Sequence, residues 1–346
     1  MRFGAIAALA ALPVLVLAAC GEDDGAPPGG STSSGGSSSS SSGSSSGGGS
    51  SSSSGGSSSS SGSSSGDAGG DASYPNPIAG IGAVQLVSDT HQFTEGPLWL
   101  PARSVLIFSD IPANRIFELK PPSAVSTFRN PSGNANGNAL GPGDVIYSGE
   151  HGGHRVVKQA PGGALEVVLA TYMGKKLNSP NDVIVKKDGN VYFTDPDYAA
   201  DPADKQPKQQ VFRVAPGGAV SIVDDTLLKP NGIALSPDES RLYVTSAQGD
   251  FVNVYDVAAN GATSNGRKLM DTAAGPDGLA VDDAGNLYAA TAAGVEVYDS
   301  AGKKIGTIAV PMRASNVAFG GAARKTLYIT AQTSLYSVDV NVPGPP

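Results

Sequence analysis

Short apolar runs separated by polar turn residues recur along most of the chain. The stretch Leu177–Asp195 is typical: polar residues 178–182, the apolar run 183–185, a turn of Asp, Gly and Asn at 188–190, and a second apolar run at 191–193. β-Branched and aromatic residues favour a pleated strand, and Asp-Gly-Asn tolerates the positive φ of a tight turn, so the pattern predicts a β-hairpin. No long stretch shows helical periodicity, so we expect an all-β domain.

The same pattern recurs in six copies, and a polar residue opens each copy. The opening residues are Glu95, Asn136, Asn181, Asn231, Asp277 and the pair Ser315-Asn316. They follow one another at intervals of 41, 45, 50, 46 and about 38 residues, and each copy continues into a second and a third apolar run. Three or four strands in every copy is the pattern of a propeller blade. The sequence therefore predicts an all-β, six-bladed β-propeller rather than a two-sheet sandwich.

Two features refine this prediction. The run Ala83–Val87 precedes the first copy and can supply the outer strand of the last blade, which would close the ring. Trp99 alternates with Leu98 in the first strand of the first blade, so we expect it to pack between blades.

The first 20 residues have the anatomy of a secretory signal. Arg2 is followed by an apolar run over residues 3–16, which is too short to span a bilayer as a helix. The ending Leu17-Ala18-Ala19-Cys20 resembles the lipobox of bacterial lipoproteins. We therefore expect residues 1–20 to be a lipoprotein signal peptide, with Cys20 lipid-modified and the protein exported and anchored to a bacterial membrane. An ordinary signal peptide is the alternative.

Composition separates the remaining chain into two parts. Residues 21–74 consist almost entirely of Ser and Gly and predict a disordered tether, which leaves residues 75–346 for the propeller. Cys20 is the only cysteine, so the propeller has neither a disulfide nor a cysteine metal site. The net charge of −8 argues against a nucleic-acid partner. We expect a monomer that contacts a membrane only through its anchor.

The opening residues also predict the site. The first strand of every propeller blade lines the central channel, so these side chains should converge at one end of it. Asn-Gly and Asp-Gly also suit turns, but Glu95 at the same position does not. Carboxylate and amide oxygens suit Ca²⁺ or Mg²⁺, and two carboxylates in a narrow channel repel each other without a cation. We expect a divalent cation, Ca²⁺ in preference to Mg²⁺, Zn²⁺ or Mn²⁺.

Four motifs resemble those of the senescence marker protein/gluconolactonase/luciferin-regenerating family: Thr94-Glu95-Gly96-Pro97, Ser179-Pro180-Asn181-Asp182-Val183, Pro230-Asn231-Gly232 and Gly275-Pro276-Asp277-Gly278-Leu279. Phe108–Pro112, Gly149–His151 and Phe193–Pro196 resemble its bacterial gluconolactonase branch. The resemblance implies a lactonase whose cation is held by Glu95, Asn231 and Asp277, with Asn181 as ligand or substrate contact. It also makes Asp277 the candidate catalytic base or nucleophile.

The chain departs from the family pattern at two places. Some members carry an arginine where this chain has Ser179, and Asn138 and Gly143 break the usual pattern of the second blade, so that Asn136 matches only loosely. The identity of the substrate is left open by these departures.

The far ends of the second strands should border the site as well. They carry Asp110, His151, Asp195 and Ser246. We predict substrate contacts from Asn136, Asn181, His151 and Asp195, and a role for His151 either as a hydrogen-bond partner or proton relay or as a structural residue. His91 and His154 are expected to be structural.

Together these features predict a metal-dependent hydrolase that opens a lactone ring. The cation would polarise the lactone carbonyl, and Asp277 would activate water or attack directly. The alternatives are a phosphotriesterase-like hydrolase on the same propeller and a non-catalytic surface propeller that binds a sugar or a protein with structural calcium.

Overall fold

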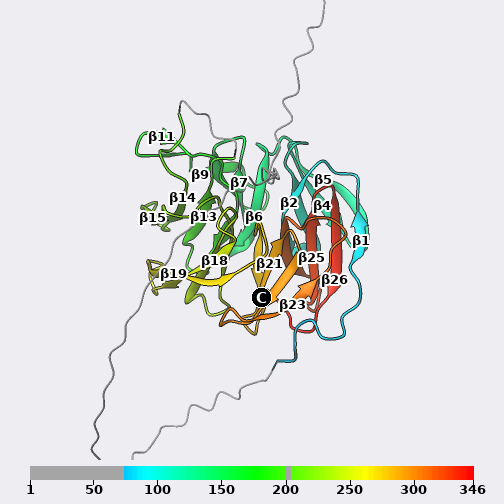
Figure 1. The fold of residues 1–346 in the computed structure, drawn as a ribbon. Helices are drawn as coiled ribbons and strands as arrows, with labels where there is room; N and C mark the ends of the chain where they lie inside the picture. The colour runs from blue at the N-terminus through cyan, green and yellow to red at the C-terminus, as the bar shows by residue number, and fades with distance from the viewer. Residues whose placement is uncertain (1–73, 199–203) are drawn as a thin grey trace, which may run out of the picture. The chain divides into compact units, whose positions relative to one another are not determined.

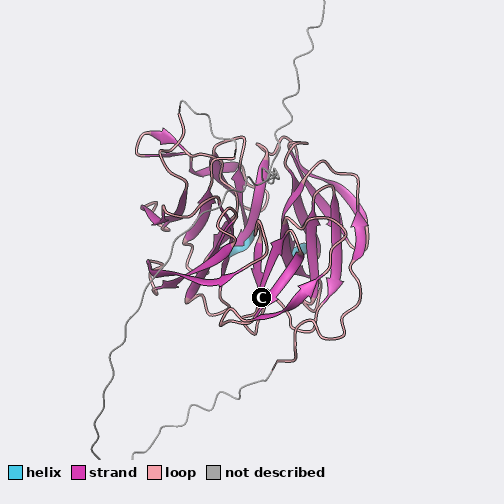
Figure 2. Cartoon of the chain, viewed as in Figure 1, coloured by secondary structure: helices cyan, strands magenta, loops and turns pink. Residues whose placement is uncertain are grey.

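The computed structural model describes residues 74–198 and 204–346. The predicted signal peptide, Cys20 and residues 21–73 of the predicted tether lie outside the described residues. Within the described ranges the chain is built from strands, with two short 3₁₀ turns at Pro101–Arg103 and Pro142–Asp144 (Figure 2). No helix in these ranges has the length and apolar character needed to cross a membrane.

Six four-stranded antiparallel sheets surround a central channel, which confirms the predicted six-bladed β-propeller (Figure 1). From inner to outer strand, blade one consists of β2 (Thr94–Leu100), β3 (Val105–Asp110), β4 (Arg115–Lys120) and β5 (Ala124–Arg129), and blade two of β6 (Ala135–Gly141), β7 (Val145–Glu150), β8 (Arg155–Gln159) and β9 (Leu165–Leu169). Blade three consists of β12 (Val183–Val185), β13 (Val191–Asp195), β14 (Gln210–Val214) and β15 (Val220–Asp224), and blade four of β16 (Pro230–Leu235), β17 (Arg241–Ser246), β18 (Phe251–Val257) and β19 (Thr263–Asp271). Blade five consists of β20 (Leu279–Val281), β21 (Leu287–Thr291), β22 (Gly294–Tyr298) and β23 (Lys304–Ile308), and blade six of β24 (Asn316–Gly320), β25 (Thr326–Ala331), β26 (Ser334–Asp339) and β1 (Gln85–Ser88). A separate small hairpin, β10 (Thr171–Tyr172) with β11 (Lys175–Lys176), follows blade two.

The ring is closed by strands from the two ends of the described chain. The first strand, β1, pairs antiparallel with β26 as the outer strand of blade six, which confirms the expectation for the upstream run. The inner strands β24 and β2 also contact each other. Trp99 of blade one stacks on Tyr328 of blade six with ring centroids 6.0 Å apart, so the tryptophan packs between blades as predicted.

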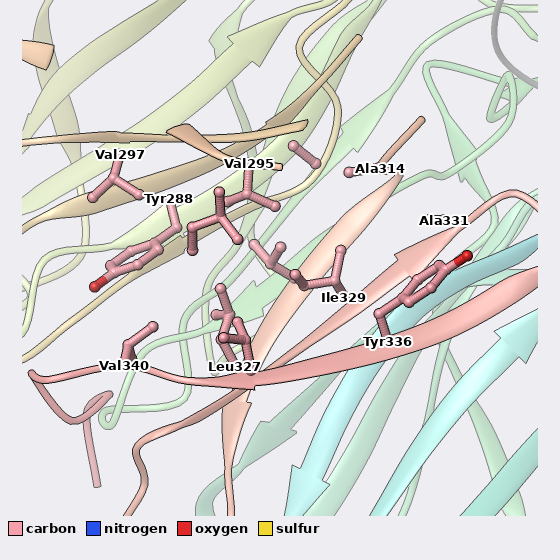
Figure 3. Packing of buried hydrophobic residues seen from close by; sticks show 13 residues of the cluster. Tyr288, Val295, Val297, Ala314, Leu327, Ile329, Ala331, Tyr336 and Val340 are labelled. Carbon is pink, nitrogen blue, oxygen red and sulfur yellow. The ribbon is translucent and has the colours of Figure 1, made fainter. Parts of the chain in front are cut away.

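The apolar core fills the spaces between neighbouring blades. The cluster between blades five and six, for example, joins Tyr288, Val295 and Val297 to Leu327 and Ile329 (Figure 3). Each blade is covered on both faces, and all five residues of β21 are buried. The second strands therefore need continuous apolar runs rather than alternation. Full burial of each such side chain stabilises the fold by about 1.5–3 kcal/mol.

The inner strands begin irregularly. Pairing of β2 with β3 shifts between Glu95 and Leu98, and pairing of β16 with β17 shifts between Pro230 and Ile233. The same irregularity occurs in β6, after Ala135. A bulge of this kind bends a strand and redirects a side chain, and here it lies at the residues that open the sequence repeat.

Candidate active site

Five polar residues open the inner strands of the first five blades and lie at the same end of the channel. Glu95, Asn136 and Asn231 occupy the irregular starts of β2, β6 and β16, whereas Asn181 and Asp277 each lie two residues before the first residue of β12 and β20. Every one of these side chains is at most 2 % exposed. The structure therefore brings together the residues that the repeat singles out.

Glycine follows the opening residue in four of the blades, at positions 96, 137, 232 and 278, and lets the neighbouring backbones come close. A Cβ on Gly232 would lie 2.2 Å from the carbonyl oxygen of Asp277. The Gly232 N–H instead donates to that oxygen at 3.1 Å, and the Gly137 N–H donates to the Asn181 carbonyl at 2.8 Å. Only glycine permits this approach, which fixes the distance between site residues of adjacent blades.

Hydroxyl groups from the second strands fix the same residues from behind. Each donates to the backbone carbonyl of an opening residue in the next blade, and the pairs are Ser109 with Asn136, Thr194 with Asn231, and Thr245 with Asp277, at 2.7, 2.6 and 2.9 Å. Because all of these groups are buried, their hydrogen bonds hold the backbone of the site in one position.

The side chains at the centre, in contrast, keep polar atoms without partners. Among the described residues, no hydrogen bond reaches Oε1 of Glu95, Oδ1 of Asp277, or either amide atom of Asn136 and Asn181. An unpaired buried polar atom costs about 1–3 kcal/mol, and folded proteins rarely leave several in one place. The cluster is arranged for a ligand that supplies these interactions.

Burial and mutual repulsion disfavour the charged carboxylates. Burial raises the pKa of Glu95 well above its usual value, and the charges of Asp277 and Asp182 raise it further. Burial also raises the pKa of Asp277 to about 7; Arg313 opposes this rise and Asp182 adds to it. A cation among these groups would reverse both effects, because it favours the ionised form of every carboxylate beside it.

The donor set fits a hard divalent cation. It combines two carboxylates, from Glu95 and Asp277, with the amide oxygens of Asn181 and Asn231, and oxygen-rich sets of this kind suit Ca²⁺ or Mg²⁺. No group of three or more His, Cys, Asp or Glu side chains in the described ranges is placed to hold a metal. Any cation here would therefore depend on the asparagine oxygens.

Asp182 and Asn316 complete the centre. The sequence placed Asn316, in the pair Ser315-Asn316, among the opening residues, but it assigned neither Asn316 nor Asp182 a ligand or substrate role. The Asn316 amide lies 3.1 Å from Glu95 Oε2 and 3.4 Å from Asp182 Oδ2. Burial raises the pKa of Asp182 to about 7. One signal was visible in the sequence: Asp182 stands at the position that glycine occupies after Glu95, Asn136, Asn231 and Asp277. A Cβ on Gly137 would lie 2.2 Å from Oδ1 of Asp182, so the glycine of blade two leaves room for this carboxylate.

Asn138, which breaks the expected apolar pattern of blade two, is a buried hydrogen-bonding residue. Its amide nitrogen donates to the Gly96 carbonyl at 2.8 Å and to Ser109 Oγ at 2.9 Å, and its amide oxygen accepts from Ser148 Oγ at 2.8 Å. The departure at this position thus links blade two to the backbone beside Glu95.

His151, Tyr198 and Lys229 form one side of the site. The His151 ring stacks on Tyr198 with centroids 6.3 Å apart, and the Lys229 ammonium lies 4.5 Å from the centroid of the same tyrosine ring. Burial, followed by the charges of His154 and Lys229, lowers the pKa of His151 to about 4, so its imidazole is neutral at neutral pH. Its Nδ1 has no hydrogen-bond partner among the described residues. The Asn231 amide nitrogen donates to the Tyr198 hydroxyl at 3.3 Å, so the amide oxygen of Asn231 points away from this hydroxyl.

Asp195, a predicted substrate contact, bonds the backbone that leads to Asn181. Its two carboxylate oxygens accept the backbone N–H groups of Asn178 and Ser179 at 2.8 and 2.9 Å. Asp110 and Ser246, at the same place in blades one and four, likewise bond the backbone that leads into their own inner strands. The contacts of Asp195 favour support of the loop that carries Asn181. Direct contact with substrate stays a prediction.

The other two histidines make local structural contacts. The His154 Nδ1 lies 2.5 Å from the Asn178 carbonyl, and the His91 Nε2 lies 2.8 Å from Ser88 Oγ. Both contacts are consistent with the structural roles expected for them.

Known proteins resemble this chain over most of the propeller. Residues 93–333 match the family described as the SMP-30/Gluconolactonase/LRE-like region. A gluconolactonase from Zymomonas mobilis is 33 % identical over 289 residues, which cover 74 % of this chain and 80 % of that protein. A pentonolactonase from Haloferax volcanii is 27 % identical over 257 residues, which cover 71 % of this chain and 84 % of its own length.

Solved structures agree. A gluconolactonase from Xanthomonas campestris matches with a TM-score of 0.69 and 31 % identity, covering 74 % of this chain and 89 % of its own. Regucalcin from Agrobacterium tumefaciens, described as a calcium-binding protein, matches with a TM-score of 0.64 at 18 % identity and covers 76 % of this chain and 95 % of its own. At that identity the second likeness shows the fold alone.

Proposed function

Starting from the fact that this chain belongs to the SMP-30/gluconolactonase/LRE-like family and is a lactonase, we propose that it opens a sugar lactone with the help of a divalent cation. Glu95, Asn181, Asn231 and Asp277 would hold the cation, and Ca²⁺ is the preferred ion. The observation that carries this proposal is the set of buried, unpartnered oxygens at the mouth of the channel.

The cation would supply Lewis acidity toward the lactone carbonyl. Asp277 is the residue of this chain that would move the proton, because its Oδ1 is unpartnered and faces the same centre. It takes a proton from the attacking water and returns it to the ring oxygen when the C–O bond breaks. Alternatively it attacks the carbonyl directly: the ring C–O bond breaks as an acyl-aspartate anhydride forms, and water then hydrolyses the anhydride, supplies the proton of the ring hydroxyl and restores the carboxylate. His151 is a poor proton donor at neutral pH, because its low pKa keeps the imidazole neutral; it serves as a hydrogen-bond partner.

A sugar fits the remaining free groups. The amide nitrogens of Asn136 and Asn181 are donors without acceptors among the described residues, and the hydroxyl oxygens of a polyol would supply acceptors. The similarity to a gluconolactonase and to a pentonolactonase supports an aldonolactone.

The test is hydrolysis of glucono-δ-lactone and of aldopentonolactones, followed in a pH-stat and corrected for spontaneous ring opening. We expect turnover that a chelator abolishes and that Ca²⁺ restores better than Mg²⁺, Zn²⁺ or Mn²⁺. Asp277→Asn should lower kcat by at least about 10²-fold, the scale of a lost general base. Asp256→Asn, on β18 and with a side chain that is 44 % exposed, is the control.

Three outcomes would contradict the proposal. Turnover that is unchanged by the chelator and by Asp277→Asn would exclude both the catalytic role of the cation and the role of Asp277 as the base. Faster turnover of organophosphates than of any lactone would indicate a phosphotriesterase-like hydrolase. Tight Ca²⁺ binding without turnover on either class would indicate a non-catalytic binding propeller.

We also propose that Cys20 carries the lipid anchor of an exported protein. The support is the lipobox-like sequence that ends at Cys20. Expression in a bacterium with labelled palmitate should label the wild-type chain and should not label Cys20→Ala. Equal labelling of both chains would refute the anchor.

A further inference from the structure

A cavity lies between blades one and two, away from the cluster of opening residues. Its volume is about 490 Å³, within the range of roughly 300–1,000 Å³ that is typical of small-molecule sites. Leu100 and Leu140, which line it, are at the ends of β2 and β6 that lie farthest from Glu95 and Asn136. Five residues along a strand correspond to about 17 Å, so this cavity is separate from the lactone site.

The walls of the cavity are mainly apolar. Leu100, Phe128, Leu140 and Ile146 come from four strands of the two blades, and Pro161 follows β8. A fully polar ligand, such as the aldonate that lactone opening releases, would find few partners on these walls.

Arg129, the last residue of β5, brings a cation into this apolar setting. Its guanidinium donates to Ser148 Oγ at 3.3 Å and to Gln159 Oε1 at 2.9 Å, both uncharged acceptors. Its Nε is buried and has no hydrogen-bond partner in residues 74–198 and 204–346. In the same ranges no carboxylate lies within 4.0 Å of its guanidinium. Burial lowers the pKa of Arg129, and the distant charge of Glu150 opposes that shift only in part.

The other charged groups of the cavity do not neutralise this cation. Arg103 pairs with Glu118 and lies 5.5 Å from the centroid of the Phe128 ring. Asp144 is exposed at the rim and forms no ion pair with another described residue. A partly buried cation without an adjacent anion is unfavourable, and a bound anion would relieve it.

We propose that this cavity binds a small organic carboxylate with an apolar body. The carboxylate pairs with the Arg129 guanidinium, whose orientation Ser148 and Gln159 already fix, and the apolar body packs against Phe128 and Leu140. A guanidinium has five N–H donors, of which two have the partners named above, so donors remain for a carboxylate.

The test is isothermal titration calorimetry of the full chain with 4-phenylbutyrate and with its neutral analogue 4-phenylbutyramide. We expect saturable binding of the carboxylate, at least about tenfold weaker binding of the amide, and a similar loss in Arg129→Met, because a hydrogen-bonded charge pair is lost in each case. Gluconate, a carboxylate without an apolar body, should bind at least tenfold more weakly than 4-phenylbutyrate.

A second variant guards against misfolding of Arg129→Met. Ala160→Trp places bulk at the exposed edge of the cavity and leaves the guanidinium in place, and it should weaken binding of 4-phenylbutyrate about as much. Lactone hydrolysis and unfolding temperature, measured for each variant, show that the fold and the lactone site are intact. Equal affinity for the acid and the amide, unchanged affinity in both variants, or no binding at millimolar concentration would overturn the proposal.

Discussion

The amide nitrogen of Asn316 lies 3.1 Å from Oε2 of Glu95, although the two residues are 221 positions apart in the chain. The bond crosses from the last blade to the first and sets the rotamer of the carboxylate. Since it engages Oε2, it leaves Oε1 of Glu95 directed at the centre without a partner. Asn316 therefore supports a proposed ligand rather than acting as one.

Asn316→Ala should weaken Ca²⁺ binding by about 10- to 100-fold, the range for loss of a residue that orients a metal ligand. Calorimetric titration of the metal-free protein with Ca²⁺, after the chelator has been removed, measures this affinity directly and does not depend on turnover. Asn260→Ala, at an exposed turn, should leave the affinity unchanged. Equal affinity in the two variants would mean that Glu95 keeps its position without the amide.

In the presence of a chelator, the free energy of unfolding of the protein should fall as the pH rises from about 4 to about 7. Asp182 and Asp277 have their pKa raised from the usual 3.8 to about 7 by burial, so the folded state retains protons that the unfolded state has released. Stability that is fully present below pH 4 is thus lost as the pH rises through 7, by no more than about 4 kcal/mol for each group.

Thermal unfolding in a chelator across this pH range measures the effect. Saturating Ca²⁺ should reverse the slope, because the cation favours the ionised carboxylates. Glu95→Gln removes a third carboxyl group whose pKa burial raises in the folded protein, and it should therefore flatten the slope in the chelator. Stability that rises with pH in the chelator would show that these carboxylates are ionised in the folded protein without a cation.

Tyr198→Phe should weaken Ca²⁺ binding several-fold while it preserves the aromatic stack. The tyrosine hydroxyl lies 3.3 Å from the amide nitrogen of Asn231, and without that partner the amide can turn its nitrogen toward the cation. The ring, which contacts His151 and Lys229, is retained in phenylalanine. Tyr74→Phe, at an exposed tyrosine, is the control, and a drop in kcat with unchanged Ca²⁺ affinity would assign the hydroxyl to the substrate instead.

Gly232→Ala should destabilise the fold by about 2–4 kcal/mol and disturb the position of Asp277. The added Cβ would meet the Asp277 carbonyl oxygen at 2.2 Å, so the backbone of blade four or blade five must shift. The matched control is Gly217→Ala, since nothing lies within 4 Å of a Cβ at that position. Urea unfolding of both variants tests the difference, and equal midpoints would show that the inner strands can separate without cost.

The repeat made the architecture predictable, because one pattern carried both the number of blades and the place of the opening residues. The repeat also grouped the opening residues without coordinates, whereas the choice of Glu95, Asn181, Asn231 and Asp277 as ligands rested on the family resemblance. Even the closing strand near Gln85–Ser88 was accessible, since the last copy lacked an outer strand.

Residues outside the repeat could not be placed in this way. Tyr198 and Lys229 lie on segments that lead out of and into strands, and their meeting across 31 positions depends on how blades three and four pack. The contacts of Asp195 were also inaccessible, because the end of a strand can face either the channel or the loop beside it. Only the backbone N–H groups of Asn178 and Ser179 decide between these two.

The pairing of β1 with β26 has a consequence for the order of events during synthesis. Ser88 pairs with Leu335, so β1, the first strand to be synthesised, can pair only after β26, the last strand, has been made. At about 5–20 residues per second, translation of the roughly 250 residues between them takes about 12–50 s. During that interval β1 has no partner strand in blade six, and the backbone of Gln85–Ser88 stays available to any other strand edge. Errors of assembly in this protein should therefore concentrate at the seam between its first and last strands.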